Sequence, residues 1–553
     1  MDWYQNAVVY QIYPRSFKDT NSDGIGDLRG IQSKLPYLKS LGIDALWLCP
    51  FYPSPNDDNG YDVSDYLGVH EDFGTLADFE ELAGELRENG IHLILDMVLN
   101  HSSDEHPWFQ ESKKSASNPY SDYYIWHEGS HEGTQRTPPN NWTSIFGGSA
   151  WEWCDERKEF YLHLFSKKQP DFNWENPRVR AQLTEIVRTW AERGVDGFRL
   201  DVINFISKKA GFPDVPGNLL HAPELHYTCG PRLHEYLRGL HQEVFQSFGS
   251  MSVGETPGID PQAAALYCAK DRKELDMIFH FEHTSVDHGA GGIWDVSEFR
   301  FEDFFSIQSL WQEKMEEMGG WNSLYLENHD QSRFISRICP NPQLRERSSG
   351  VAATLLLTLK GTPYIYQGQE ISMDNVAFES IDEYQDIWTL NHYREAVERG
   401  DDPREILKRI HYRSRDNSRT PMQWDDSKFA GFSAVDPWIR LNPNSQKINV
   451  SAAEKNSLSV LHTYRKLIGI KKEDAVLQAG KFKRISTSRE RVFAYTRELG
   501  SEKRMILLNF SEEDQSIEKL VGAGSSLLFS SWPEPLERKS APLRPFEGRI
   551  YIF

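Results

Sequence analysis

Four carboxylates in this sequence lie at or just after the ends of apolar segments, where they could take part in acid–base chemistry. They are Asp96 in LDMVLNH, Asp201 in GFRLDVIN, Glu255 in SVGET and Asp330 in ENHDQSR. Any one of them alone would suit a helix cap or a structural ion pair equally well. Carboxylates that lie together raise one another's pKa, and a nearby cation keeps one of them ionised. A proton donor beside an ionised carboxylate is what hydrolysis of a glycosidic bond requires.

Three basic residues accompany the carboxylates. Arg199 lies two residues before Asp201, so the two side chains project from the same face of a strand. His101 comes shortly after the first carboxylate, and His329 directly precedes the last one. We therefore expect Arg199 to keep Asp201 ionised, provided that the fold brings these segments together.

Eight short apolar segments, rich in Val, Ile, Leu and Tyr, alternate with segments of helical spacing. The apolar segments are 7–14, 45–51, 91–99, 195–202, 251–255, 277–282, 322–328 and 363–368. Nearly continuous apolar runs are typical of parallel strands that are buried on both faces. The helical segments include 75–89, 178–193, 231–248 and 347–360. This α/β pattern predicts a (β/α)8 TIM barrel, with a doubly wound open sheet as the alternative.

A barrel would bring the four carboxylates to one face, because the C-terminal ends of its strands all lie there. Residues 102–169 interrupt the pattern after the third strand and predict an inserted subdomain B above that face. The barrel would then consist of residues 1–101 and 170–474, with a helical insertion at about 374–414. From residue 475 to 553 short alternating segments predict a C-terminal antiparallel β domain.

Composition and charge exclude several classes of partner. The formal net charge is −21 at pH 7, which argues against nucleic acid and against an anionic membrane surface. The apolar run at 351–359 is too short to span a membrane, and the N-terminus lacks the basic start of a signal peptide. We therefore expect a cytoplasmic protein. The five cysteines are widely separated and predict neither a disulfide framework nor a zinc site.

Five blocks of the sequence resemble the ordered blocks of glycoside hydrolase family 13, the α-amylase family. They are DMVLNH (96–101), QPDFN (169–173), GFRLDVIN (197–204), VGET (253–256) and ENHDQSR (327–333). With further matches before and after them, the resemblance covers nearly the whole chain. It implies an enzyme that retains the anomeric configuration, with Asp201 as nucleophile, Glu255 as general acid/base and Asp330 as the carboxylate that stabilises the transition state.

The same resemblance implies a set of substrate-binding residues. Some would hold the terminal glucose, and others would come from the overhanging subdomain or from the strand of the nucleophile. The full set is Asp58, Tyr61, His101, Phe146, Phe165, Gln169, Arg199, Val202, His329 and Arg415.

Two segments narrow the substrate class. QPDFN and RDNSRTPMQWD (415–425) are similar to segments of the oligo-1,6-glucosidase subfamily, whose members remove one glucose at a time from the non-reducing end. In the enzymes that the chain resembles, a Val directly after the nucleophile tends to accompany α-1,6 cleavage, and Val202 stands there. By strand alternation its side chain should point away from Asp201, which would also suit simple core packing. The resemblance thus implies a short α-1,6-linked oligosaccharide as substrate and isomaltose as its smallest example.

Proteins with other functions share most of these blocks. They are an α-1,4-glucosidase, a trehalose-6-phosphate hydrolase, a sucrose isomerase and, from another class, a non-catalytic relative. A phosphate ligand would want Lys or Arg at the pocket mouth. Lys208 and Lys209 could supply the charge, although solvated surface lysines are the plainer interpretation. They belong to the loop 207–227, which we cannot match to a known substrate preference. We expect a monomer.

The segment 19–27, DTNSDGIGD, begins like a calcium-binding EF-hand loop, with Gly24 at the sixth position. An EF-hand loop ends in a bidentate Glu at position twelve, where this chain has Gly30. This argues against a calcium sensor. As in the subfamily that the chain resembles, we expect one structural Ca²⁺, with an Asx-rich turn that binds no metal as the alternative. The expected ligands are Asp19, Asn21, Asp23, Asp27 and the carbonyl oxygen of Ile25.

Overall fold

The computed structural model describes residues 2–132, 135–219, 222–339, 341–522, 524–532, 534, 536 and 538–553. Its largest sheet has eight parallel strands in the order β11-β10-β9-β3-β2-β1-β15-β14. The strands are β1 (Val9–Ile12), β2 (Ala45–Leu48), β3 (His92–Val98), β9 (Gly197–Asp201), β10 (Met251–Glu255), β11 (Met277–Phe279), β14 (Ser323–Leu324) and β15 (Thr362–Tyr366). Seven lie within the apolar segments that predicted them, and β15 begins one residue before its segment.

The two end strands of this sheet meet and close it into a barrel. Ser323 Oγ in β14 donates to the carbonyl oxygen of Ile278 in β11 at 2.6 Å. The predicted (β/α)8 barrel is therefore confirmed, and the open sheet is excluded.

Alternation along each strand divides its side chains between the barrel interior and the surrounding helices. Trp47 in β2 belongs to one buried cluster together with Ile94 and Val253. Its neighbours Leu46 and Leu48 belong to the larger cluster that also contains residues of the surrounding helices. Because both faces are buried, each strand needs apolar residues at successive positions.

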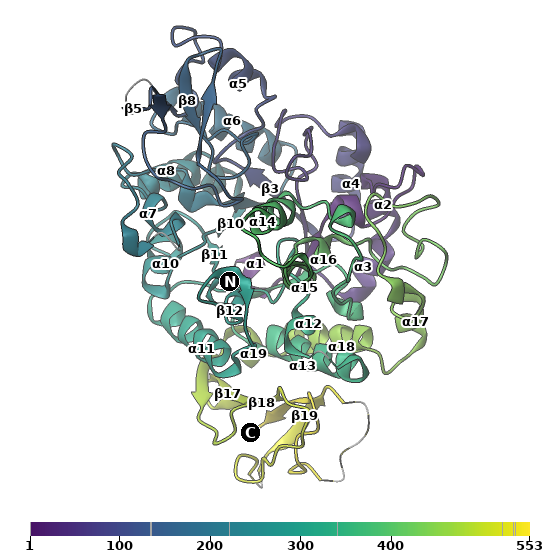
Figure 1. Ribbon diagram of the computed structural model, residues 1–553. Coiled ribbons are helices and arrows are strands. Elements are labelled where there is room, and N and C mark those ends of the chain that lie inside the picture. The colour runs from purple at the N-terminus through teal and green to yellow at the C-terminus, as the bar shows by residue number, and fades with distance from the viewer. Residues whose placement is uncertain are drawn as a thin grey trace.

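Helices follow the strands and surround the sheet (Figure 1). In the barrel they are α2 (Leu28–Ser33), α3 (Leu35–Leu41), α4 (Leu76–Glu88), α6 (Pro177–Glu192), α7 (Glu224–Tyr227), α8 (Leu233–Leu240), α9 (Gln246–Phe248), α10 (Pro261–Cys268), α11 (Phe301–Glu317), α12 (Phe334–Ile338) and α13 (Arg345–Thr358). Thr75 caps α4 and forms a capping box with Asp78, which explains where that helix begins. A short helix, α1 (Trp3–Asn6), precedes the first strand.

The segment after β3 folds into small antiparallel sheets, at the upper left of Figure 1. It contains α5 (Pro107–Ser112), β4 (Trp126–His127), β5 (Ser130–Glu132), β6 (Gln135–Thr137), β7 (Trp151–Cys154) and β8 (Glu159–Leu162). A hairpin of β12 (His288–Gly289) and β13 (Gly292–Val296) follows β11.

The segment after β15 is largely helical. It contains α14 (Ile387–Glu398), α15 (Pro403–Arg413), α16 (Asp416–Arg419), α17 (Val450–Lys455), α18 (Val460–Glu473) and α19 (Ala475–Ala479). Within residues 374–414, where we expected a helical insertion, the chain forms α14 and α15.

The chain ends in a five-stranded antiparallel sheet of order β16-β17-β18-β20-β19, at the bottom of Figure 1. Its strands are β16 (Lys481–Ile485), β17 (Val492–Leu499), β18 (Glu502–Asn509), β19 (Ser526–Ser530) and β20 (Gly548–Ile552). The predicted domain boundaries remain our proposal, and α19 precedes the first strand of this tail.

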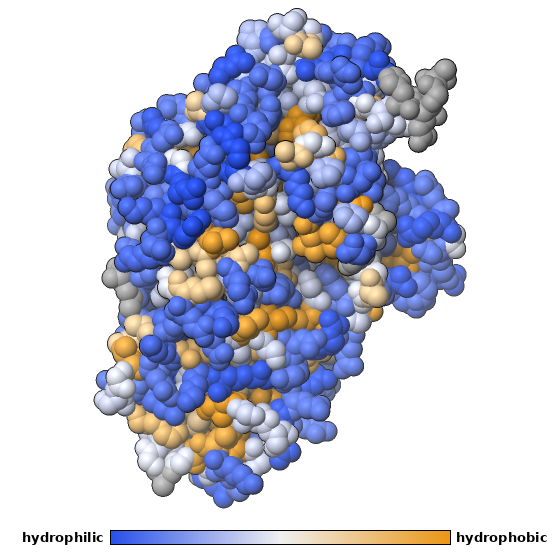
Figure 2. Space-filling view, turned by 90° about the vertical axis from the view of Figure 1, so that its left-hand side faces the viewer, coloured by the Kyte–Doolittle hydropathy of each residue, from blue (hydrophilic) through white to orange (hydrophobic). Residues whose placement is uncertain are grey.

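Hydrophilic residues cover most of the face shown in Figure 2, and hydrophobic residues gather in a band across its middle and in its lower part. In the part of the chain that the model describes, no helix combines the length and apolarity needed to cross a membrane.

Candidate active site

Neighbouring strands bring one arginine and three carboxylates together at the C-terminal end of the barrel. The strand register pairs Arg199 in β9 with Asp96 in β3. Nη1 of Arg199 lies 2.7 Å from Oδ1 of Asp96 and 2.7 Å from Oδ1 of Asp201. Its Nη2 donates to Oε2 of Glu255, at the end of β10. A single buried guanidinium therefore contacts all three carboxylates, and two of the predicted catalytic residues share it.

Burial and crowding set the protonation of this cluster. Burial raises the pKa of Asp201 well above its ordinary value and repulsion from Glu255 and Asp96 adds to the rise, while Arg199 opposes it. Burial is also the main cause of the raised pKa of Asp96. Since one cation faces three carboxylates, full ionisation would leave two uncompensated negative charges. The cluster can therefore retain a proton near neutral pH.

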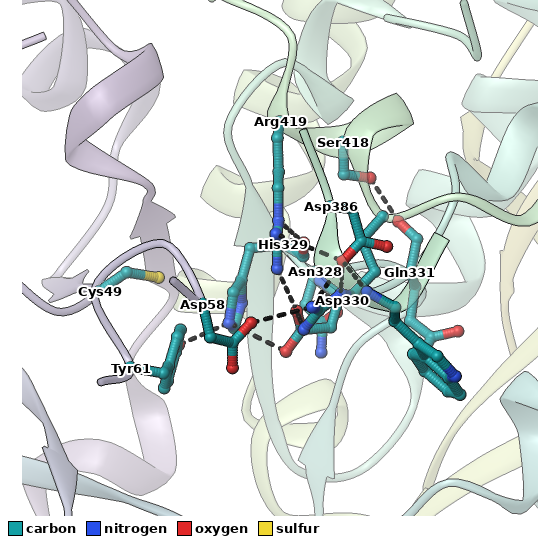
Figure 3. A network of polar contacts seen from close by, with 12 residues as sticks. Cys49, Asp58, Tyr61, Asn328, His329, Asp330, Gln331, Asp386, Ser418 and Arg419 are labelled. Atoms are coloured by element: carbon teal, nitrogen blue, oxygen red, sulfur yellow. Dashed lines mark hydrogen bonds and ion pairs between the residues drawn. The ribbon is translucent and has the colours of Figure 1, made fainter. Parts of the chain in front are cut away.

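Asp330 has the opposite surroundings, because cations meet it from several sides (Figure 3). Its Oδ1 accepts from Nη2 of Arg419 at 2.8 Å and from Nη1 of Arg415 at 3.2 Å. Its Oδ2 lies 3.1 Å from Nε2 of His329. Burial alone would raise the pKa of Asp330, but His329 and the two arginines hold it well below its ordinary value. Burial alone would lower the pKa of His329, and the Asp330 carboxylate raises it to about 10.

Tyr61 joins the two charge clusters. Its hydroxyl donates to Oδ2 of Asp96 at 3.0 Å and lies 2.5 Å from Nε2 of His329. The ring of Tyr61 also stacks on His329 with centroids 5.3 Å apart. One continuous polar network thus runs from Glu255 through Arg199 and Tyr61 to Asp330.

The network continues to the residues expected to hold a terminal sugar. Nη2 of Arg415 donates to Oδ1 of Asp58 at 2.9 Å. Oδ2 of Asp58 accepts from Nε2 of Gln169 at 3.2 Å, and the same amide nitrogen lies 3.2 Å from Nε2 of His101. Burial lowers the pKa of His101 to about 4, so its imidazole is neutral at pH 7.

Two aromatic residues of the segment after β3 line this part of the network. The guanidinium of Arg415 lies over the ring of Phe146, 4.9 Å from its centroid. The ring centroids of Phe146 and Phe165 are 5.5 Å apart, and those of Phe165 and His101 are 5.1 Å apart. The fold therefore brings together the residues predicted for catalysis and for binding of the terminal sugar.

Sequence reasoning missed part of this network. Asp386 accepts from Nε and Nη2 of Arg415, at 2.9 and 2.6 Å, and caps α14. Arg419 stands one helical turn after Arg415 in a segment that had been noted, so the i,i+4 spacing could have indicated it. The only signal for Asp386 was a helix-cap pattern, which does not point to a site.

A second missed group lies behind His329. The Gln11 side-chain amide is 2.8 Å from Nδ1 of His329 and 3.2 Å from Sγ of Cys49. An imidazolium donates from both ring nitrogens, so a charged His329 needs an acceptor at Nδ1. The amide oxygen of Gln11 can provide it after a half turn of the amide.

Val202 departs from the expected alternation. The strand ends at Asp201, and Val202 is left-handed at φ 35° and ψ 44°, a strained conformation for a β-branched residue. Its N–H donates to Oε2 of Glu255 at 3.1 Å. Its side chain joins a buried cluster with Trp142 and Phe205. The expectation that it points away from Asp201 by strand alternation was therefore based on the wrong backbone conformation.

Lys208 is not a surface lysine, contrary to the plainer sequence interpretation. It is 8% exposed, and its Nζ lies 2.6 Å from Oδ2 of Asp171 and 2.7 Å from Oδ1 of Asn100. Nδ2 of Asn100 in turn lies 3.2 Å from Nδ1 of His101. A buried ammonium of this kind supports the sugar-binding residues from behind and is not free to bind a phosphate.

The loop 207–227 attaches the segment after β3 to the barrel. The side chain of Asn141 donates to the carbonyl oxygen of Val215 at 3.1 Å and accepts from its N–H at 2.7 Å. Nε1 of Trp142 donates to the carbonyl oxygen of Pro213 at 2.8 Å, and the Tyr227 hydroxyl donates to that of Thr143 at 2.9 Å.

The expected calcium loop lies between β1 and α2 and contacts residues near 432–438. Asp19 accepts from the N–H groups of Ser22 and Gly24, at 2.7 and 3.0 Å. Asp27 caps α2 through the N–H of Gly30 at 2.6 Å. Among the described residues, no group of three or more His, Cys, Asp or Glu is close enough to hold a metal ion.

The donor chemistry of this loop still fits Ca²⁺. Asp19 and Asp27 are both buried, and neither has an ion-pair partner in the described part of the chain. A hard cation with oxygen ligands would supply the positive charge that these carboxylates lack. The calcium site remains a prediction.

Comparisons with known proteins agree with this geometry. The model for the α-amylase catalytic domain matches residues 11–480. The chain is 49% identical over 558 residues to an oligo-1,6-glucosidase from Parageobacillus thermoglucosidasius, covering 99% of this chain and 98% of that one. The crystal structure of Bacillus licheniformis trehalose-6-phosphate hydrolase, 41% identical, superposes with a TM-score of 0.93 over 100% of both chains. The trehalulose synthase from Pseudomonas mesoacidophila MX-45, 40% identical, has a TM-score of 0.95 over 100% of this chain and 99% of that one.

Proposed function

Because the chain belongs to the α-amylase family and is a glycoside hydrolase, we propose that it is a retaining, exo-acting α-glucosidase. It releases glucose from the non-reducing end of short α-1,6-linked oligosaccharides such as isomaltose. The observation that carries the proposal is the Asp58–Arg415 ion pair of 2.9 Å beside Phe146. With Gln169 and His101 it closes the far end of the site, so that one terminal sugar fits beyond the bond to be cleaved.

The carboxylates around Arg199 support a double-displacement mechanism. In the first step Asp201 attacks the anomeric carbon, while Glu255 donates a proton to the glycosidic oxygen and the remaining sugar leaves. In the second step Glu255 takes a proton from water, and the resulting hydroxide displaces Asp201 and restores the α configuration. Retaining enzymes place their two carboxyl groups about 5–5.5 Å apart. The shared contact of Asp201 and Glu255 with one guanidinium supports such proximity.

The cations around Asp330 support electrostatic stabilisation of the transition state. His329, Arg415 and Arg419 keep Asp330 ionised. A fixed carboxylate beside the sugar stabilises the positive charge that develops on the anomeric carbon and ring oxygen. Because the pKa of Asp330 is well below its ordinary value, Asp330 stays ionised near neutral pH. Its charge is therefore constant while Glu255 donates and accepts a proton.

The linkage preference rests on relatives and on Val202. The relative from Parageobacillus thermoglucosidasius carries the name oligo-1,6-glucosidase. Val202 directly follows Asp201, and its N–H donates to Glu255. Its branched side chain would crowd the direct approach of an α-1,4-linked ring more than that of a 1,6-linked ring with its extra rotatable bond. The trehalose-6-phosphate alternative is weakened because Lys208 is paired with Asp171.

Calcium and cellular location complete the proposal. One structural Ca²⁺ would be held by the side chains of Asp19, Asn21, Asp23 and Asp27 and by the carbonyl oxygen of Ile25. The ion would tie the β1–α2 connection together without taking part in the reaction. A cytoplasmic monomer is the state that we infer.

The proposal is tested by measuring glucose release from isomaltose, maltose, sucrose, trehalose and trehalose 6-phosphate at equal concentrations. We expect isomaltose to give the highest kcat/KM. A higher kcat/KM on maltose would show that the enzyme is an α-1,4-glucosidase. A higher kcat/KM on trehalose 6-phosphate would show that it is a trehalose-6-phosphate hydrolase.

A further inference from the structure

A groove with a volume of about 620 Å³ lies between the segment after β3 and α14, and none of the three catalytic carboxylates lines it. One wall contains residues 144, 146–149, 163 and 165–168, and the other contains Ile387, Leu390 and Arg394 of α14. Sites for small ligands in proteins commonly have volumes of about 300–1,000 Å³, so the groove is large enough for a disaccharide.

The groove is distinct from the catalytic site but shares two aromatic residues with it. Phe146 and Phe165 belong to the lining of the groove, whereas Asp201, Glu255 and Asp330 do not. Nδ2 of Asn391 donates to the carbonyl oxygen of Phe146 at 3.1 Å. This bond joins α14 to the segment after β3 at the boundary between groove and catalytic site.

Several polar groups of the groove have no partner within the described residues. The side chains of Glu152, Lys167, Gln385 and Arg394 line it and make no hydrogen bond or ion pair there. His163 is 4% exposed, and its Nδ1 lies 3.0 Å from the carbonyl oxygen of Phe165. That contact makes Nδ1 the donor and leaves Nε2 as a buried acceptor without a partner in the described chain.

The charges of the lining cancel. It contains three carboxylates and three cationic side chains, namely Asp57, Glu152, Glu395, Lys167, Lys168 and Arg394. A balanced set favours neither an anion nor a cation. Free donors and acceptors beside aromatic and aliphatic side chains suit a neutral ligand with many hydroxyl groups.

We propose that this groove is a second carbohydrate-binding site, which takes a neutral gluco-oligosaccharide of two or three units without cleaving it. The proposal rests on the proposed function only for the sugar class. Because Phe146 and Phe165 belong to both sites, an oligosaccharide in the groove would contact the same aromatic residues that line the catalytic network.

Isothermal titration of isomaltotriose into the Glu255→Gln enzyme tests the proposal, because hydrolysis is suppressed while both sites remain. We expect a stoichiometry of two. In a Glu255→Gln enzyme that also carries Glu152→Ala and Arg394→Ala, we expect one site with unchanged affinity and at least a 10-fold weakening of the other. Arg399→Ala is the matched control, since Arg399 ends the same helix, pairs with Asp401 and does not line the groove.

The possible failures are distinguishable. One binding site in the Glu255→Gln enzyme, unaffected by the groove substitutions, would overturn the groove proposal and leave the proposed function standing. No binding of isomaltotriose at either site would count against the proposed function itself. Two sites that both survive the groove substitutions would place the second site elsewhere and also overturn the groove proposal.

Discussion

The two halves of the candidate site differ in charge balance. In the first, which we call the Arg199 half, one guanidinium faces Asp96, Asp201 and Glu255. In the second, the Asp330 half, the Asp330 carboxylate faces His329 and two arginines, and Arg415 also pairs with Asp58 and Asp386, so the cations match the carboxylates in number. Burial is common to both, but it raises the pKa of Asp201 and is outweighed at Asp330.

This difference separates proton chemistry from fixed charge. A cluster with too few cations keeps a proton at a pH at which an isolated carboxyl group would have lost it, so it has a proton to donate and recover, as a general acid/base must. A carboxylate surrounded by cations keeps its charge over the working pH range and acts on the transition state through its field. Tyr61 links the halves without equalising them, because its neutral hydroxyl contacts both.

The largest effect should come from removing the reacting groups of the Arg199 half. We expect Asp201→Asn and Glu255→Gln each to lower kcat on isomaltose by about 10⁴-fold or more, since each removes a step of the double displacement. Stopped glucose assays measure the loss, and circular dichroism checks the fold. Asp155→Asn, at an exposed surface pair, is the matched control and should keep full activity. Substantial activity in either variant would remove that residue from its role.

The next prediction contrasts the halves by pH. Because the Asp201 carboxylate must be ionised to attack, activity falls as pH decreases through its raised pKa. Arg199→Lys weakens the cation that opposes this rise, so the acid limb of kcat/KM should move to higher pH. Asp330→Asn should instead lower kcat/KM by about 10²–10³-fold and leave the acid limb in place. If Arg199→Lys and Asp330→Asn moved the acid limb by the same amount, the two halves would not differ in their effect on the ionisation of Asp201.

A smaller effect is expected next to the Arg199 half, at Val202. Val202→Ala or Val202→Thr removes or replaces one methyl-scale contact, worth about 1–3 kcal/mol or about 10–200-fold in relative kcat/KM. We expect the isomaltose-to-maltose ratio to shift toward maltose. Kinetics on the two disaccharides provide the measurement. An unchanged ratio in both variants would show that Val202 does not select the linkage.

The smallest effect should come from the calcium loop, outside both halves. Chelation should lower the melting temperature by at least about 2 °C, because an ion that binds only the folded chain stabilises it. Re-addition of Ca²⁺ should restore it, and kcat measured well below the melting temperature should not change. An unchanged melting curve, with no calcium found by elemental analysis, would favour the metal-free Asx-rich turn.

The sequence predicted the barrel and the convergence of Asp201, Glu255 and Asp330, because apolar strands and strand-end carboxylates are local patterns. It could not predict which groups from other parts of the chain complete the network. Asp386 reaches Arg415 from the start of α14, and Gln11 reaches His329 from the first strand. Such contacts depend on how distant segments pack, which periodicity does not reveal.

Two sequence interpretations failed for other physical reasons. Lys208 was read as a surface lysine, because a charge in a polar loop is usually solvated, and Asp171 and Asn100 make its burial possible. Alternation was applied to Val202 although the strand ends one residue earlier. Backbone conformation at the end of a strand is set by the contacts there, in this case the hydrogen bond to Glu255.

The central claim is that Asp201 is the nucleophile of a retaining α-glucosidase, and trapping the covalent intermediate tests it most directly. A fluorinated glucosyl fluoride that forms the intermediate quickly and releases it slowly is incubated with the enzyme, and the labelled peptide is identified by mass spectrometry. The account predicts one glucosyl adduct on the peptide that contains Asp201, and none in Asp201→Asn. An adduct on another carboxylate, or turnover with no adduct and initial release of β-glucose, would contradict it.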